Sequence, residues 1–278
     1  MKKILAVIDA VNYKEEQLEA IQYVSGMLNG NLTIVMLEDV NTITPLMAPD
    51  FAAGVPGRYY EIVIKASEEK SRIIQDNTEA LRQAITARGL TCTIHTDKGS
   101  AAEETILESR FADLVLLGKE LSFPFLFDTE PTGFVKNVLA NAQCPVLVIP
   151  ENMSVLKGVV FTYNGTFSSM YAIRAFANIF PELVAKDATV VYVCEKGHDT
   201  IPHEKLLKEY LDGYNKNISY KIFSGRADAV LQAYLEEKQD HVTTFGAYGR
   251  SRLSRFFNSS SAENILRMMN GPLFITHP

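Results

Sequence analysis

Short apolar runs alternate along the chain with longer segments whose apolar residues recur at helical spacing. In the first half, apolar runs predict strands at residues 4–8, 32–37, 91–95, 114–117 and 146–149. Helical patterns cover residues 15–28, 59–88 and 134–142, and a further helix carries Glu103, Glu104 and Glu108 on its polar side. Neighbouring parallel strands need a crossover connection of a dozen or more residues, which these helices would supply. The order therefore predicts an open five-stranded parallel sheet with helices on both faces.

The second half repeats this order. Its apolar runs fall at residues 159–163, 189–194, 218–223, 242–245 and 273–276, and its helical patterns at 168–180, 204–215, 227–238 and 262–269. The ends of the halves also match, since Asn137 lies eight residues before Pro145 and Asn264 lies eight residues before Pro272. We interpret the chain as two Rossmann-like α/β domains, residues 1–150 and 155–278. A single large α/β sheet with accidental internal similarity is the alternative.

Composition disfavours several other classes of protein. Apolar residues make up 47% and charged residues 22% of the 278 residues, which is typical of a globular chain. A net charge of −6 disfavours general binding to the polyanionic backbone of nucleic acids. Cys92, Cys144 and Cys194 form no C-x-x-C pair, so we expect buried thiols in a reducing compartment. No apolar run is long enough to cross a membrane, and we expect a soluble, cytoplasmic protein.

The strongest candidate for a ligand site follows the fourth strand of the second half. Ligands of open α/β sheets bind at the carboxyl ends of strands, near the point where strand order reverses. Here Gly246 and Gly249 precede residues 250–258, and three serines at 259–261 open a helix. Glycines let the backbone approach an anion, and serines at a helix start offer N–H and hydroxyl donors at the positive end of the helix dipole. The pattern predicts a phosphate site, unless the serines only cap the helix.

These residues resemble those of the tandem universal stress proteins. Nucleotide-binding members of that family share the pattern G-x-x-G, nine residues, G-[ST] after the fourth strand, with an Asp at the end of the first strand on the adenine side. The resemblance spans essentially the whole chain, through residues 3–9, 112–118, 144–150 and the loop that begins at Gly246. It implies a stress-response protein with a universal stress domain in each half.

The second half departs from the family pattern at two positions. It keeps Gly246, Gly249 and, at Ser260, the hydroxyl, but Ser259 stands at the third glycine and Asn164 at the strand-end Asp. Asparagine still offers a carbonyl acceptor, whereas a Cβ at position 259 can collide with a phosphate. Residues 250–258 carry three arginines and no acidic residue, a charge that attracts phosphate. We therefore expect a partly retained nucleotide motif here.

The first half departs from the pattern in a complementary way. It keeps Asp9 and Gly118, but Leu121 stands at the second glycine, and Thr132-Gly133 follows a one-residue insertion. Residues 119–131 carry one lysine against three acidic residues, a charge that repels an anion. We expect a degenerate phosphate loop in this half.

We predict a non-enzymatic stress-response protein whose second half alone binds an adenine nucleotide, ATP or AMP, with Mg²⁺ arriving only on the nucleotide. The resemblance implies contacts from Gly246, Gly249, Ser259 and Ser260 to the phosphates, and from Asn164 and Val193 to base and ribose. The positive charge of residues 250–258 adds Arg250 as a phosphate contact. The alternative is a protein-interaction module without nucleotide, which would engage its partner through residues 41–58 or the Phe-rich residues 123–127. Slow ATP hydrolysis or adenylyl transfer, and local nucleic-acid binding by the arginines, are weaker hypotheses.

The resemblance also implies how the two halves associate. Single-domain members of the family commonly dimerise through their last strands. In this chain residues 146–149 and 273–276 would pair internally and cover two sheet edges that otherwise invite aggregation. We therefore expect an intramolecular pseudo-dimer, which can associate further into a homodimer.

Overall fold

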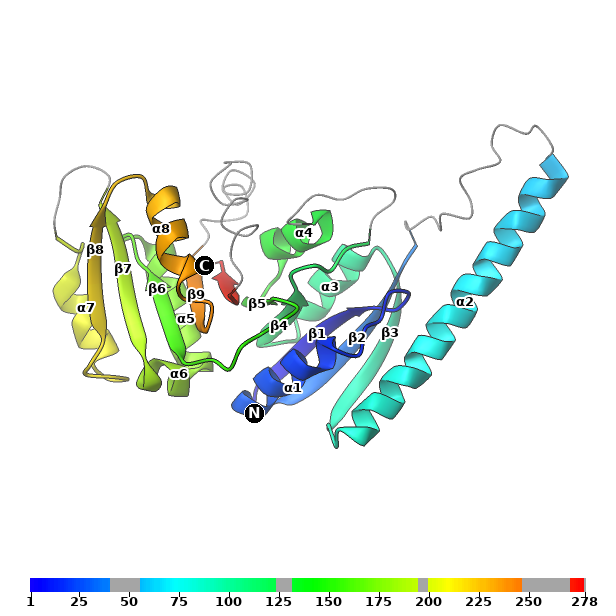
Figure 1. The fold of residues 1–278 in the computed structure, drawn as a ribbon, viewed down its shortest axis with the longest axis horizontal. Coiled ribbons are helices and arrows are strands. Elements are labelled where there is room, and N and C mark those ends of the chain that lie inside the picture. Colours follow the sequence, from blue (N-terminus) through cyan, green and yellow to red (C-terminus); the bar gives the residue numbers. More distant parts are fainter. Residues whose placement is uncertain (41–55, 124–131, 195–199, 247–270, 278) are drawn as a thin grey trace.

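The structure is a computed structural model of the full chain. It describes residues 1–40, 56–123, 132–194, 200–246 and 271–277, with the backbone alone at 56–63. Figure 1 shows two α/β units side by side, each built around strands of one sheet. Residues 41–55 of the candidate partner segment 41–58, residues 124–127 of the Phe-rich segment and the predicted helix at 262–269 lie outside the described residues. Residues 56–58 begin a helix instead.

Each half contributes five strands. The first half supplies β1 (Lys3–Asp9), β2 (Asn31–Asp39), β3 (Cys92–Gly99), β4 (Leu114–Gly118) and β5 (Val146–Ile149). The second supplies β6 (Gly158–Thr162), β7 (Ala188–Cys194), β8 (Ser219–Ser224), β9 (His241–Gly246) and β10 (Leu273–Thr276). Within each half every strand pair is parallel. The predicted α/β class and the strand positions are confirmed.

The two halves share one sheet. The strand order is β3-β2-β1-β4-β5-β10-β9-β6-β7-β8, and β5 and β10 run antiparallel with Phe274 opposite Leu147. The predicted pairing of the two closing strands is therefore confirmed. This pairing joins the two predicted five-stranded sheets into a single ten-stranded sheet, which the prediction of two separate sheets did not include.

The helices follow the predicted positions with a few corrections. They are α1 (Gln17–Leu28), α2 (Pro56–Ala87), α3 (Ala101–Ser109), α4 (Gly133–Asn141), α5 (Phe167–Ile179), α6 (Pro181–Lys186), α7 (Glu204–Leu211) and α8 (Ala227–Glu236). Helix α2 begins three residues before its predicted start, at a proline, whose fixed φ suits a first helical position. The short α6, also opened by a proline, was not predicted. Helix α7 ends before Gly213, earlier than its pattern indicated.

The core lies on both faces of the sheet. Successive residues of β1, such as Ile4 and Leu5, belong to different hydrophobic clusters because their side chains point to opposite faces of the sheet. Helices α1, α2, α5, α6 and α7 contribute buried residues to one cluster, and α3, α4 and α8 contribute to the other. Both faces of the strands are therefore covered, as the continuous apolar runs required.

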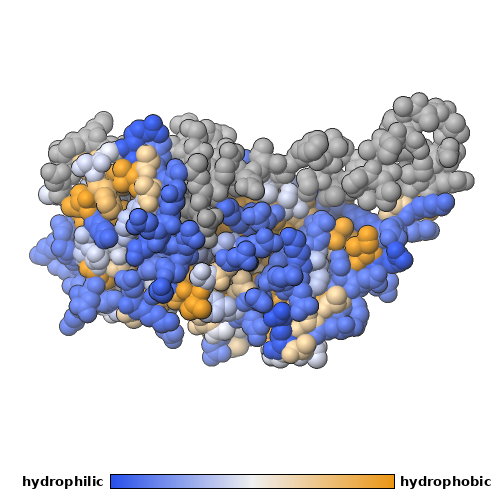
Figure 2. Space-filling model, in the orientation of Figure 1, coloured by the Kyte–Doolittle hydropathy of each residue, from blue (hydrophilic) through white to orange (hydrophobic). Residues whose placement is uncertain are grey.

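The described surface is mostly hydrophilic on the face that Figure 2 shows. Hydrophobic residues form small separate patches on this face. Phe111 and Phe167, exposed by 66% and 67%, are among the large apolar side chains that reach solvent. Among the helices described, none is long and apolar enough to cross a membrane.

Candidate functional site

Each half has a point where strand order reverses. In the first half β1 lies between β2 and β4, and in the second half β6 lies between β7 and β9. The carboxyl ends of β1 and β4, and likewise of β6 and β9, are therefore neighbours. These are the two positions at which an open α/β sheet places a ligand.

A cavity of about 300 Å³ opens at the carboxyl ends of β1 and β4. Its apolar walls come from β1, α1, β4 and the end of β5, through Val7, Ala20, Ile21, Leu116 and Ile149. Its polar lining comes from Asp9, Asn12 and Gln17, and Lys14, Lys119, Glu120 and Glu151 add charge. Sequence reasoning favoured the second half, and this cavity lies in the first.

Asp9 shapes the turn at the floor of this cavity. It is the last residue of β1 and is 4% exposed. Its Oδ1 accepts hydrogen bonds from the backbone N–H groups of Val11 at 2.8 Å and Asn12 at 3.2 Å, and its Oδ2 accepts from Asn12 Nδ2 at 2.7 Å. The carboxylate therefore holds the connection between β1 and α1, a role that Asp commonly takes in turns.

Residues that border the loop after β4 hydrogen-bond to one another and to the start of α4. Leu121 is 5% exposed, and its N–H donates to the carbonyl of Gly118 at 3.1 Å. The Thr132 hydroxyl donates to the Leu121 carbonyl at 2.6 Å and accepts from the N–H of Val135 at 3.1 Å, capping α4. An anion at this helix start would have to displace the threonine hydroxyl from that N–H.

In the second half Asn164 occupies the position that Asp9 has in the first. Its Oδ1 accepts from the N–H of Thr166 at 3.2 Å and from the Thr166 hydroxyl at 2.6 Å. Thr166 in turn caps α5 by accepting from the N–H of Ser169. The side chain of Asn164 is exposed, while Val193 lies half-buried in the neighbouring strand β7. The carbonyl acceptor expected to meet base or ribose thus also stabilises a turn.

Gly246 ends β9 and packs directly on the start of α5. A Cβ at this position would lie 1.9 Å from the carbonyl oxygen of Ser168 and 2.6 Å from the nitrogen of Ser169. Only glycine fits at this distance, so the residue has a packing role in the fold. Gly249, Arg250, Ser259 and Ser260 lie outside the described residues, and their predicted contacts to phosphate stay predictions.

Comparisons with known proteins agree with the architecture. A universal stress protein of Synechocystis sp. is 18% identical over 292 aligned positions, covering 98% of this chain and 99% of the relative. The crystal structure of a universal stress protein from Archaeoglobus fulgidus has a TM-score of 0.72 at 14% identity, covering 99% of this chain and 98% of that one. A putative universal stress protein structure from Pseudomonas aeruginosa has a TM-score of 0.58 at 14% identity, covering 100% and 94%. No protein-family model matches the chain.

The chain has the fold of a tandem universal stress protein. The resemblance that the motifs indicated is thereby confirmed over the whole length. In this fold Asp9 and Asn164 occupy equivalent positions, but Asp9 is buried and Asn164 is exposed. The described cavity at the strand ends lies in the first half.

The structure also locates the cysteines, tests for a metal site and adds one residue that the sequence did not indicate. None of the three cysteines forms a disulfide; Cys194 is buried, while Cys92 and Cys144 are half-buried. Across the described ranges, no group of three or more His, Cys, Asp or Glu residues is placed to hold a metal ion. Sequence reasoning missed Gln17, the first residue of α1, whose buried Oε1 finds no hydrogen-bond partner among the described residues. Its signal in the sequence was its place at the start of the helix that follows the strand-end Asp9, eight residues further along the chain.

Proposed function

We propose that this protein is a cytoplasmic, non-enzymatic regulator of the universal stress type, whose second half binds an adenine nucleotide, ATP or AMP. The supporting observation is that Asn164 and Gly246 lie at the carboxyl ends of neighbouring strands, since Phe161 of β6 pairs with Thr244 of β9. The arginine-containing residues 250–258 continue directly from that strand end in the sequence. A phosphate there would meet glycine backbone and guanidinium groups, the chemistry that suits it best.

A binding role is preferred to catalysis for chemical reasons. Phosphoryl or adenylyl transfer needs a positioned nucleophile, a base and usually a metal ion held by carboxylates. The position after β6 that corresponds to Asp9 holds Asn164, an amide that does neither acid–base work nor strong metal binding. Mg²⁺ would therefore arrive with the nucleotide rather than on a protein site.

Calorimetric titration with ATP and with AMP, each with and without Mg²⁺, tests this proposal. We expect saturable binding that Arg250→Ala weakens roughly tenfold, the cost of one lost charged hydrogen bond. Gly249→Val should abolish binding, because a branched side chain would occupy the phosphate position. Arg174→Ala, on the exposed side of α5, is the matched control, since it removes the same charge from the same half. No heat and no thermal shift at millimolar nucleotide would reject the proposal.

An interaction module without nucleotide is the second candidate function. It is favoured by the hydrogen bonds that Asn164 makes to Thr166 and by the packing role of Gly246, because neither residue then needs a ligand to explain it. Its partner would contact residues 41–58 or 123–127, most of which lie outside the described part of the chain. Protein purified directly from cells distinguishes the two: this candidate expects no nucleotide by mass and a protein partner lost when residues 41–55 are deleted.

A further inference from the structure

Another cavity lies where the two halves of the chain meet, and its volume is about 240 Å³. The first half lines it with Lys2 and the end of α1, and the second half lines it with residues from 179 to 186, at the end of α5 and in α6. Lys2 directly precedes β1, and α6 leads into β7. This seam cavity is therefore at the amino ends of strands, away from the carboxyl ends where the nucleotide is proposed to bind.

Lys2 brings a half-buried ammonium group to the seam cavity. Its Nζ donates to the backbone carbonyls of Asn178 and Ile179, each at 2.6 Å, at the end of α5. Burial lowers the pKa of Lys2, and the attraction of Asp113 opposes this effect only in part. An ammonium group has three N–H donors, so two carbonyl partners leave one donor for a ligand.

The corresponding lysine of the second half has a partner that Lys2 lacks. Lys157 directly precedes β6, as Lys2 directly precedes β1. The Nζ of Lys157 lies 2.7 Å from Oδ2 of Asp240, so its positive charge is paired with a carboxylate. Lys2 meets neutral carbonyl groups at the same place in its own half. A carboxylate from a ligand would give Lys2 the partner that Asp240 gives Lys157.

The rest of the lining adds apolar surface and a second positive charge. Met27, Leu28 and Phe180 supply apolar walls from both halves. Lys186 is exposed at the rim, and Glu182 is the acidic residue of the lining. The lining therefore has a net charge of +1 in a chain whose net charge is −6. This local charge attracts an anion, and the volume, below the range typical of drug-sized ligands, suits a small one.

We propose that the seam cavity binds a small monocarboxylate with an apolar body. The carboxylate accepts a hydrogen bond from Lys2, and the apolar body contacts Met27 and Phe180. Because Lys2 belongs to the first half and Phe180 to the second, the ligand bridges the two halves and stabilises their association. This site does not depend on the nucleotide site proposed for the second half.

Three probes of similar shape separate charge from apolar contact. Phenylacetate is an anion, phenylacetamide is its neutral analogue, and 2-phenylethylamine is a cation with the same ring. Binding is followed by the methyl NMR signal of Met27, identified by its loss in Met27→Leu, since this residue lines the cavity. We expect phenylacetate to shift the signal to saturation. Phenylacetamide should bind roughly tenfold more weakly for the loss of the charged hydrogen bond, and 2-phenylethylamine more weakly still.

Variants test the contact with Lys2. Lys2→Met removes the ammonium group, so it should weaken phenylacetate roughly tenfold and cancel the rise in Tm that phenylacetate gives the wild type. Lys3→Met is the matched control, because it removes the same charge from the next residue, which does not line the cavity. Lys186→Met changes an exposed residue and should weaken phenylacetate about two- to threefold, which keeps the test open if Lys2→Met does not fold. Arg250→Ala should leave these results unchanged, which separates them from the nucleotide site.

The proposal is overturned by any of three results. One is the absence of a saturable shift at Met27 with millimolar phenylacetate. Another is phenylacetamide binding as tightly as phenylacetate, which would contradict the charge argument. The third is phenylacetate binding that neither Lys2→Met nor Lys186→Met weakens, which would place the carboxylate elsewhere.

Discussion

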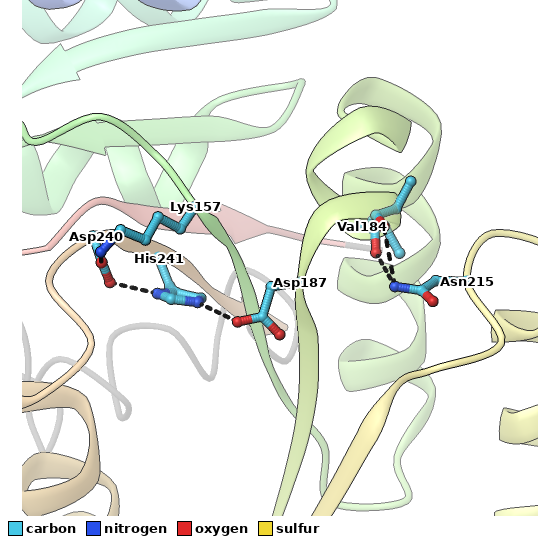
Figure 3. A network of polar contacts seen from close by, with 7 residues as sticks. Lys157, Val184, Asp187, Asn215, Asp240 and His241 are labelled. Carbon is cyan, nitrogen blue, oxygen red and sulfur yellow. Dashed lines mark hydrogen bonds and ion pairs between the residues drawn. The ribbon is translucent and has the colours of Figure 1, made fainter.

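A buried histidine joins the amino ends of three neighbouring strands (Figure 3). His241, at the start of β9 and 4% exposed, lies 2.6 Å from Asp240 Oδ1 through Nδ1 and 2.9 Å from Asp187 Oδ2 through Nε2. Lys157 Nζ lies 2.7 Å from the other oxygen of Asp240. Because Lys157 directly precedes β6 and Asp187 directly precedes β7, the network connects three strands of the second half. We expect its charges to contribute measurably to stability.

The size of that contribution can be worked from Asp240. The hydrogen bond from Lys157, and then His241, lowers the pKa of Asp240 from 3.8 to about 2. A lowering of this size corresponds to about 2.4 kcal/mol of folding free energy. Because 26% of the side chain is exposed, solvent screening reduces the expected value to about 1–2 kcal/mol.

Asp240→Asn keeps the shape of the side chain and removes its charge. A carboxyl whose pKa is lower in the folded state stabilises the fold above its unfolded value of 3.8, and loses that effect as the pH falls toward 2. We expect the variant to be about 1–2 kcal/mol less stable at pH 7, with a Tm lower by about 3–6 °C. About half of the free-energy difference should remain at pH 3.

Urea unfolding followed by far-UV circular dichroism at pH 7, 5 and 3 measures these differences. Asp76→Asn is the matched control, because Asp76 is exposed on α2 and the substitution removes the same charge. The reasoning is refuted if Asp240→Asn and the wild type are equally stable at pH 7. It is also refuted if their difference is the same at pH 3 as at pH 7.

Three further predictions concern packing and reactivity. Gly158→Ala should cost at least about 3 kcal/mol and lower the soluble yield, because the new Cβ would lie 2.0 Å from the carbonyl oxygen of Asp187; an unchanged Tm would contradict this. Phe274→Ala should cost about 3–5 kcal/mol in urea unfolding, since the fully buried ring packs edge-on against Phe176 with centroids 5.1 Å apart. Burial raises the pKa of the Cys144 thiol to about 12, so it should react slowly with a disulfide reagent at pH 8 until the protein is unfolded; rapid labelling of the native thiol would be inconsistent with that environment.

Most of the fold could be predicted because its central strands are buried on both faces, unlike the edge strands β3 and β8. A run such as Val146–Ile149 is entirely apolar and entirely buried, so its pattern left little choice of structure. The pairing of the closing strands was implied by the family resemblance, and the structure confirms it. The short α6 was missed because Pro181 interrupts the helical pattern after α5. Proline is tolerated in the first turn of a helix, and Pro181 is the first residue of α6.

The site was harder to predict because the same residue type, such as glycine, can bind a phosphate or allow close packing. Gly246 fits a phosphate loop in sequence, yet the structure explains it by contact with the backbone of Ser168. In the sequence, Leu121 showed only that a glycine of the family pattern is missing. In the structure Leu121 is buried beside the cavity, because a turn lets its N–H donate to the carbonyl of Gly118. Such relations join residues from different elements, so no local pattern contains them.

The pairing of β5 with β10 also limits how the chain can associate further. Both closing strands are used internally, so the described sheet has outer edges only at β3 and β8. Charged side chains lie along both edges, Asp97 and Lys98 on β3 and Lys221 on β8. Charges on an edge strand oppose the addition of another strand, because pairing would desolvate them. A homodimer of this protein would therefore use helix or loop surfaces rather than extend the sheet.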